Sequence, residues 1–127
     1  MNESILKSQL VKLARDTMPG FVIIRHEDRI TSGIPDISIS GNKKTTWLEV
    51  KYGTPKFASK GIQELMCNRL AIAAFACYYV IYLERSGEKW THIVHPRDVG
   101  NEEHWLHFTS GFNHQFVIDS IKKEHLL

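Results

Sequence analysis

The feature that most restricts the fold of this chain is an almost unbroken apolar run near its middle, Cys77 to Leu83 (CYYVIYL). Such a run is typical of a strand that is buried on both faces, in the centre of a sheet that helices cover. Residues 61–75 just before it place apolar side chains at helical spacing, and a turn signal leads from it into a further strand-like run at 89–94. We therefore expect an α/β protein built around a central sheet.

The first half of the chain predicts one helix and three strands. Residues 3–17 show helical spacing, with Asn2 or Ser4 as the cap and Pro19-Gly20 as the stop. Strands are expected at 21–25, 37–40 and 45–52. The resulting order is α-β-β-β-α-β-β, followed by an irregular tail in which 115–123 form a last helix. The fold class that this order predicts is α/β, with a central mixed β-sheet flanked by helices.

Bulk composition indicates one globular domain over residues 1–127, with 43% apolar and 24% charged residues. No apolar run approaches a membrane span, and the N-terminal segment lacks the apolar core of a signal peptide, so we expect a cytoplasmic protein that is neither secreted nor membrane-bound. Cys67 and Cys77 are expected to be buried free thiols. A net charge of +2 permits nucleic-acid binding without requiring it.

One strand carries an unusual mixture of side chains on one face. Strands alternate faces, so Trp47, Glu49 and Lys51 point to the same side of the strand at 45–52. A hairpin that turns at 42–43 places Asp36 directly opposite Glu49, with Cβ atoms about 5 Å apart. Two carboxylates so close repel each other, and a divalent cation between them removes that repulsion.

These charges suit phosphodiester hydrolysis. Mg²⁺ prefers oxygen ligands and commonly binds through one or two carboxylates plus substrate phosphates, and Lys51 adds a positive charge within reach. On spacing alone, however, Glu49 and Lys51 also fit an exposed ion pair, and an Asp after Pro is usually a strand-entry residue. A one-residue slip of the hairpin would also turn Asp36 to the opposite face.

The full constellation resembles a known nuclease signature. Gly33-Ile34-Pro35-Asp36 is followed thirteen residues later by Glu49-Val50-Lys51, and Gln63 opens the next helix. This pattern is similar to the PD-(D/E)xK nuclease superfamily and, more narrowly, to its VRR-NUC (virus-type replication-repair nuclease) family, in the stand-alone phage and bacterial type that resembles Holliday-junction resolvases. The resemblance implies a restriction-endonuclease-like core.

The resemblance also implies a role for each residue of the site. Asp36 and Glu49 would bind Mg²⁺, for which Mn²⁺ would substitute, with the Val50 carbonyl as a further ligand. Lys51 would be the catalytic lysine and Gln63 would support the site. Glu3 in the leading helix would reach the metal or its waters, although Glu3 and Gln63 are also ordinary first-turn residues.

The function that the resemblance implies is a metal-dependent, structure-selective DNA endonuclease that resolves four-way junctions as a homodimer. One alternative is a nuclease that acts on flaps, single strands or linear duplex, and another is a non-catalytic DNA-binding accessory module. Ser32, Lys56 and Lys60 lie in loops that flank the site and are expected to contact DNA phosphates.

Histidines and aromatic residues are abundant in the second half of the chain. The histidine spacings, such as His92 with His95, favour surface or partly buried histidines over a zinc site. Five aromatic residues could stack on DNA bases, but packing in the core or a dimer interface is the favoured interpretation for most. They are Trp90, Trp105, Phe108, Phe112 and Phe116.

Overall fold

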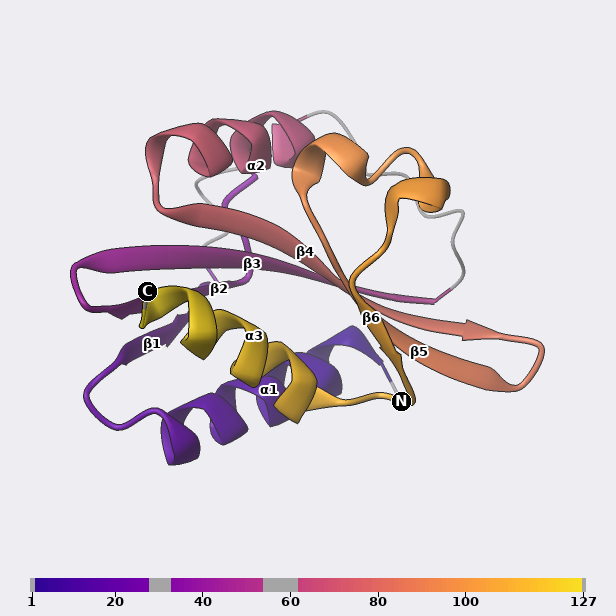
Figure 1. Cartoon of the computed structure of the whole chain (residues 1–127), viewed down its shortest axis with the longest axis horizontal. Coiled ribbons are helices and arrows are strands. Elements are labelled where there is room, and N and C mark those ends of the chain that lie inside the picture. Colours follow the sequence, from indigo (N-terminus) through magenta and orange to yellow (C-terminus); the bar gives the residue numbers. More distant parts are fainter. Residues whose placement is uncertain (1, 28–32, 54–61, 127) are drawn as a thin grey trace.

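The computed structural model describes residues 2–27, 33–53 and 62–126, with the backbone alone for 62–64. Its centre is a six-stranded mixed sheet in which the strands follow one another in chain order (Figure 1). The strands are β1 (Val22–Arg25), β2 (Ile37–Gly41), β3 (Lys44–Gly53), β4 (Ala76–Arg85), β5 (Glu88–Val94) and β6 (Phe108–Ser110). Neighbours are antiparallel except β3 and β4, which run parallel and are joined by a crossover through helix α2 (Ile62–Ala73).

Helices cover both faces of this sheet. Helices α1 (Glu3–Thr17) and α3 (His114–His125) lie side by side on one face, while α2 packs on the other beside the short 3-10 turns η1 (Pro96–Asp98) and η2 (Glu102–His104) (Figure 1). The apolar core is accordingly split by the sheet into two clusters, one for each face. Within the described residues, no helix is both long and apolar enough to cross a membrane.

Strand β4 is buried on both faces, as its apolar run predicts. Val80 and Tyr82 belong to the core beneath α1 and α3, whereas Tyr79 and Ile81 belong to the core beneath α2, and all four are fully buried. The two cysteines lie in the α2-side core as free buried thiols, which confirms that expectation.

The other elements confirm the expected order and extend it. Helix α1 begins after Asn2, whose side chain accepts a hydrogen bond from the Ile5 amide (2.9 Å), so Asn2 rather than Ser4 is the cap. The tail contains more structure than the sequence indicated. Helix α3 is amphipathic and buries Val117, Ile118 and Ile121. Strand β6 has only three residues, none of them buried, so its sequence shows no alternation of apolar and polar residues that would predict a strand.

The hairpin of β2 and β3 has the register that the sequence predicted. Pairs run from Ile37 with Leu48 to Gly41 with Lys44, and the turn between them has positive φ at both Asn42 (52°) and Lys43 (62°). Two positive φ angles define a type I′ turn, whose twist matches that of the paired strands. This register places Asp36 across from Glu49.

A buried polar contact ties the hairpin to α3. His125 is 1% exposed, and its Nδ1 lies 3.0 Å from the Gly41 carbonyl while its Nε2 lies 2.8 Å from the Thr46 hydroxyl. Because a carbonyl only accepts, Nδ1 carries the proton and Nε2 accepts from Thr46. The Asn42 side chain adds a hydrogen bond to the His125 carbonyl at 2.8 Å.

This turn predicts a stabilising substitution. Lysine pays a steric cost at positive φ that glycine does not, so Lys43→Gly should raise the free energy of unfolding by about 0.5–1 kcal/mol after the entropy of glycine in the unfolded chain is subtracted. Lys44→Gly is the matched control, because it places glycine in the β3 ladder and should destabilise. Urea unfolding of both variants tests this, and a loss of stability in Lys43→Gly would contradict it.

Candidate active site

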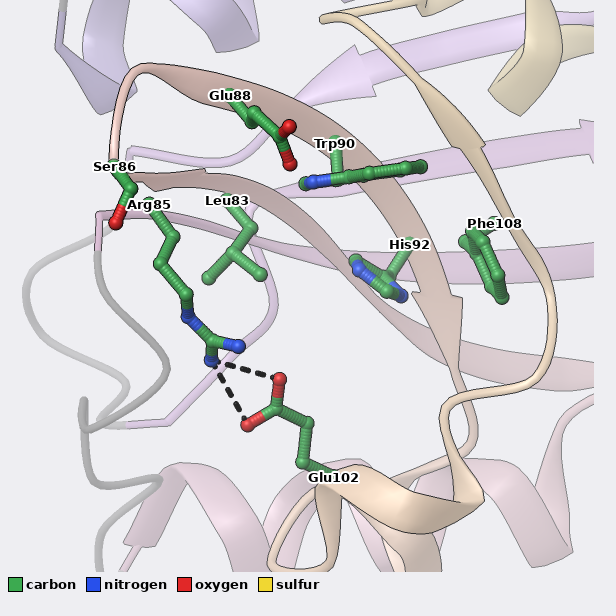
Figure 2. A pocket seen from close by; sticks show the side chains of 8 residues that line it. All are labelled: Leu83, Arg85, Ser86, Glu88, Trp90, His92, Glu102 and Phe108. Atoms are coloured by element: carbon green, nitrogen blue, oxygen red, sulfur yellow. Dashed lines mark hydrogen bonds and ion pairs between the residues drawn. The ribbon is translucent and has the colours of Figure 1, made fainter.

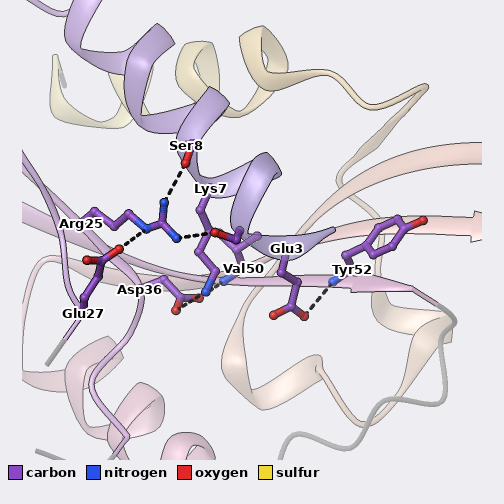
Figure 3. A network of polar contacts seen from close by, with 9 residues as sticks. Glu3, Lys7, Ser8, Arg25, Glu27, Asp36, Val50 and Tyr52 are labelled. Atoms are coloured by element: carbon purple, nitrogen blue, oxygen red, sulfur yellow. Dashed lines mark hydrogen bonds and ion pairs between the residues drawn. The ribbon is translucent and has the colours of Figure 1, made fainter. Parts of the chain in front are cut away.

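The candidate site lies where β2 and β3 separate. Their pairing starts at Ile37 and Leu48, so the edge of β3 beyond Leu48 has no β2 residue beside it. Asp36 takes the place of the missing strand, because its Oδ2 accepts a hydrogen bond from the Val50 amide at 2.8 Å (Figure 3). Asp36, which comes directly before the first paired residue of β2, therefore binds the main chain of β3 through its carboxylate.

Glu49 lies across from Asp36, and its side chain extends from β3 toward the Asp36 carboxylate. The two carboxyl groups share a hydrogen bond, and Glu49 is only 1% exposed. Burial raises the pKa of Glu49 to about 10, aided by the hydrogen bond and the charge of Asp36 and opposed by the charge of Lys51. At neutral pH the pair therefore holds one proton, which lies on Glu49. The Oε2 atom of Glu49 has no hydrogen-bond partner among the described residues.

Asp36 stays ionised beside this proton. Burial alone would raise the pKa of Asp36, but hydrogen bonds from Glu49, from the Val50 amide and from Lys7 outweigh burial and hold that pKa below its ordinary value. Lys7 reaches Asp36 Oδ1 from α1 at 2.9 Å (Figure 3). Sequence reasoning missed Lys7, because its four-residue separation from Glu3 is the spacing of an ordinary pair on a helix surface.

Glu3 lies further along the same edge of β3. Its Oε1 accepts a hydrogen bond from the Tyr52 amide at 3.2 Å, two residues, or about 7 Å, beyond the amide that Asp36 binds. The N–H and C=O of one strand residue point to the same edge, so the Val50 carbonyl also faces this edge. The structure thus brings Asp36, the Val50 main chain and Glu3 to one strand edge, and it shows no hydrogen bond from Glu3 to either acid of the pair among the described residues.

Lys51 and α2 complete the surroundings. Lys51 is half-buried and shares its face of β3 with Glu49, close enough to act on the pKa of both Glu49 and the buried Cys67 of α2. Gln63 lies in the first turn of α2, four residues before Cys67, but its side chain is outside the described residues. Three expected DNA contacts, Ser32, Lys56 and Lys60, are also outside them.

The donors at this site fit a hard divalent cation. Two carboxylates that the fold forces together, a partnerless buried carboxyl oxygen and a main-chain carbonyl are the oxygen ligands that Mg²⁺ accepts, with water and phosphate filling its other positions. Within the described part of the chain, no group of three or more His, Cys, Asp and Glu side chains could hold a metal.

Comparison with known proteins supports the fold. The chain matches no family model and no curated protein sequence. Among solved structures, it is similar to Hjc, a Holliday junction resolvase from the archaeal hyperthermophile Archaeoglobus fulgidus, with a TM-score of 0.52 and 16% identity over 75% of this chain and 73% of that one. The restriction-endonuclease-like fold expected from the sequence is thereby confirmed, while membership of the VRR-NUC family stays a prediction.

The proton on Glu49 predicts a specific pH dependence of stability. The folded protein keeps this proton up to a pH of about 10, whereas the unfolded chain releases it near its ordinary pKa of 4.5. Because the folded state binds more protons in this window, Glu49 makes the protein less stable as the pH rises from 4.5 toward 10. Glu49→Gln keeps a donor toward Asp36 and removes the titration. At pH 8 without metal it should be more stable than wild type by about 1 kcal/mol or more, or roughly 3–6 °C in Tm.

Thermal melts from pH 5 to 9 in EDTA test this prediction. The difference in Tm between Glu49→Gln and wild type should grow with pH, whereas the exposed Glu103→Gln should follow wild type throughout. Parallel curves for Glu49→Gln and wild type would mean that Glu49 is ionised in the folded protein.

Proposed function

We propose that the protein is a metal-dependent, structure-selective DNA endonuclease that hydrolyses phosphodiester bonds and resolves four-way junctions as a homodimer. The observation that carries this proposal is the Asp36–Glu49 pair, a half-buried acid in contact with a buried one, with Lys51 beside Glu49 on β3. A structural domain gains nothing from such a pair, because burying and opposing two carboxyl groups costs stability. A cation bound between the two carboxylates would offset this cost.

Asp36, Glu49 and the Val50 carbonyl would hold Mg²⁺, with Mn²⁺ as a substitute. When bound, the metal polarises the scissile phosphate and lowers the pKa of a coordinated water. The residues around the pair prepare it for this task. Val50 and Lys7 fix the two oxygens of Asp36 from two directions, so its carboxylate is oriented and ionised before any ligand arrives.

The remaining residues have distinct tasks in this proposal. Glu49 would hold the metal as a carboxylate, so its side chain would release the proton that it shares with Asp36. Lys51 lies on the same face and would orient the attacking water or offset the charge that develops on the phosphate. Glu3, held at the Tyr52 amide, would accept hydrogen bonds from metal-bound waters, and Gln63 would support the site from α2.

The choice of substrate rests on the likeness to the Hjc fold. A two-fold dimer presents two symmetry-related sites, and this geometry suits paired cuts across a four-way junction. Flaps, single strands and linear duplex are the competing substrates, and flaps and single strands differ from a junction in offering no second, symmetry-related strand to cut.

Cleavage of a labelled four-way junction in Mg²⁺ tests the site. Asp36→Asn and Lys51→Ala should each slow cleavage by about 100-fold or more, because each removes a charge that acts on the reacting phosphate. The matched controls are Asp119→Asn and Lys123→Ala, which change exposed charges on α3 and should cut like wild type. Cleavage by Asp36→Asn or Lys51→Ala at the wild-type rate would show that the chemistry lies elsewhere.

The same assay separates the competing functions. Symmetric nicks in a junction, with slow cleavage of flap and linear duplex, would support junction resolution. Faster cleavage of flaps or single strands would assign those substrates instead. DNA binding that persists in EDTA, with no cleavage in Mg²⁺, Mn²⁺ or other divalent ions, would make the protein an accessory module.

A further inference from the structure

A second concave feature lies on the α2 side of the sheet, apart from the acidic pair. It is a pocket of about 560 Å³ between β4, β5, β6 and η2 (Figure 2). This volume is within the range of small-molecule sites. Its lining includes Leu83, Arg85, Trp90, His92, Glu102 and Phe108.

Three rings form one wall of this pocket. The centroid of the Phe108 ring lies 5.8 Å from that of Trp90 and 5.2 Å from that of His92, and Figure 2 shows the three side chains along the same side. Phe108 is 49% exposed, so its ring is accessible from the pocket side. Exposed aromatic rings beside a hollow provide stacking surfaces for a flat partner.

The charges of the pocket favour a neutral partner over a phosphate. Arg85 is already engaged by both oxygens of Glu102, at 2.8 and 3.2 Å, and Glu88 adds a further acid (Figure 2). Burial lowers the pKa of His92, so its imidazole is neutral at physiological pH. The Nδ1 atom of His92 is buried with no hydrogen-bond partner among the described residues. A purely apolar ligand would leave this nitrogen without a partner, so the pocket favours a ligand that carries polar groups.

Strand pairing relates the pocket to the candidate active site. Lys51 on β3 pairs with Ile81 on β4, which pairs with His92 on β5, which pairs with Phe108 on β6. Directly paired residues share a face, so all four side chains form one row on the α2 side. At about 4.8 Å between strands, His92 lies about 10 Å and Phe108 about 14 Å from Lys51. At about 3.4 Å per stacked base, that is roughly three to four nucleotides.

We propose that this pocket binds an unpaired nucleobase of the DNA substrate, a few nucleotides from the phosphate that is cut. The inference rests on the proposed nuclease function and adds a basis for structure selectivity. In a continuous duplex every base is stacked and paired, so none can enter. Flaps and single strands offer a free base, and a four-way junction offers one where a base pair at its branch point opens. Such a base would stack on Trp90 or Phe108 while its phosphate stays outside, away from Glu88 and Glu102.

Binding measurements without metal test the pocket independently of cleavage. The probes are a single-stranded oligonucleotide, a flap and a linear duplex, with 2-aminopurine two to five nucleotides from the cleavage position. Phe108→Ala should weaken binding of the single strand and flap about 5-fold or more and leave the duplex unchanged. It should also abolish the quenching of 2-aminopurine. Phe75→Ala, which removes a comparably exposed ring (42%) outside this pocket, should match wild type.

The outcomes separate this proposal from the nuclease proposal. If wild type cuts DNA and Asp36→Asn does not, but Phe108→Ala and Trp90→Leu bind unpaired DNA like wild type, the nuclease stands and the base pocket is wrong. Equal weakening for duplex and single strand would also overturn the pocket. So would a change in oligomeric state of Phe108→Ala, because it would assign the rings to an interface between copies. If wild type binds no DNA, both proposals fail. Melting curves confirm that each variant is folded.

Discussion

The structure depends on one hydrogen bond, from the Val50 amide to Asp36. It forms where β2 leaves the sheet, so a side chain caps a main-chain edge that would otherwise lie open. The same bond orients Asp36, and together with the hydrogen bonds from Glu49 and Lys7 it keeps this carboxylate ionised. One contact thus ends a strand pair, satisfies the amide of the buried Val50 and helps to form the acidic pair. Losing it would disturb the sheet and the acidic pair together.

The parallel pairing of β3 with β4 is the second constraint. It requires a crossover, and α2 supplies it on the face that carries Glu49 and Lys51. Helix α2 therefore covers that face near Glu49, which explains the burial and the high pKa of this acid. Beyond α2, where β5 and β6 extend the sheet, the same face is open and carries the aromatic pocket. The buried acidic pair and the aromatic pocket are thus two regions of one sheet face.

Much of this arrangement could be predicted from local signals. The register followed from strand alternation and the position of the turn, and it placed Asp36 opposite Glu49. Lys7 was missed because its spacing to Glu3 suggests a surface pair, and only the tertiary structure directs both side chains to the β3 edge. The aromatic pocket was missed because it joins three strands and a 3-10 turn, and β6 has no alternation to reveal it. Such features depend on strand order in space, which periodicity does not encode.

The contact between His125 and the β2–β3 hairpin has a consequence for biogenesis. His125 and Asn42 are 83 positions apart, and α3 is the last of the described elements to leave the ribosome. The turn end of this hairpin is therefore locked only when α3 docks, because His125 is the hydrogen-bond partner of the buried Thr46 hydroxyl and of the Gly41 carbonyl. A nascent chain that has made both acids but not α3 lacks this lock. In the nuclease proposed above, the acidic pair would therefore reach its final surroundings only after α3 has been made.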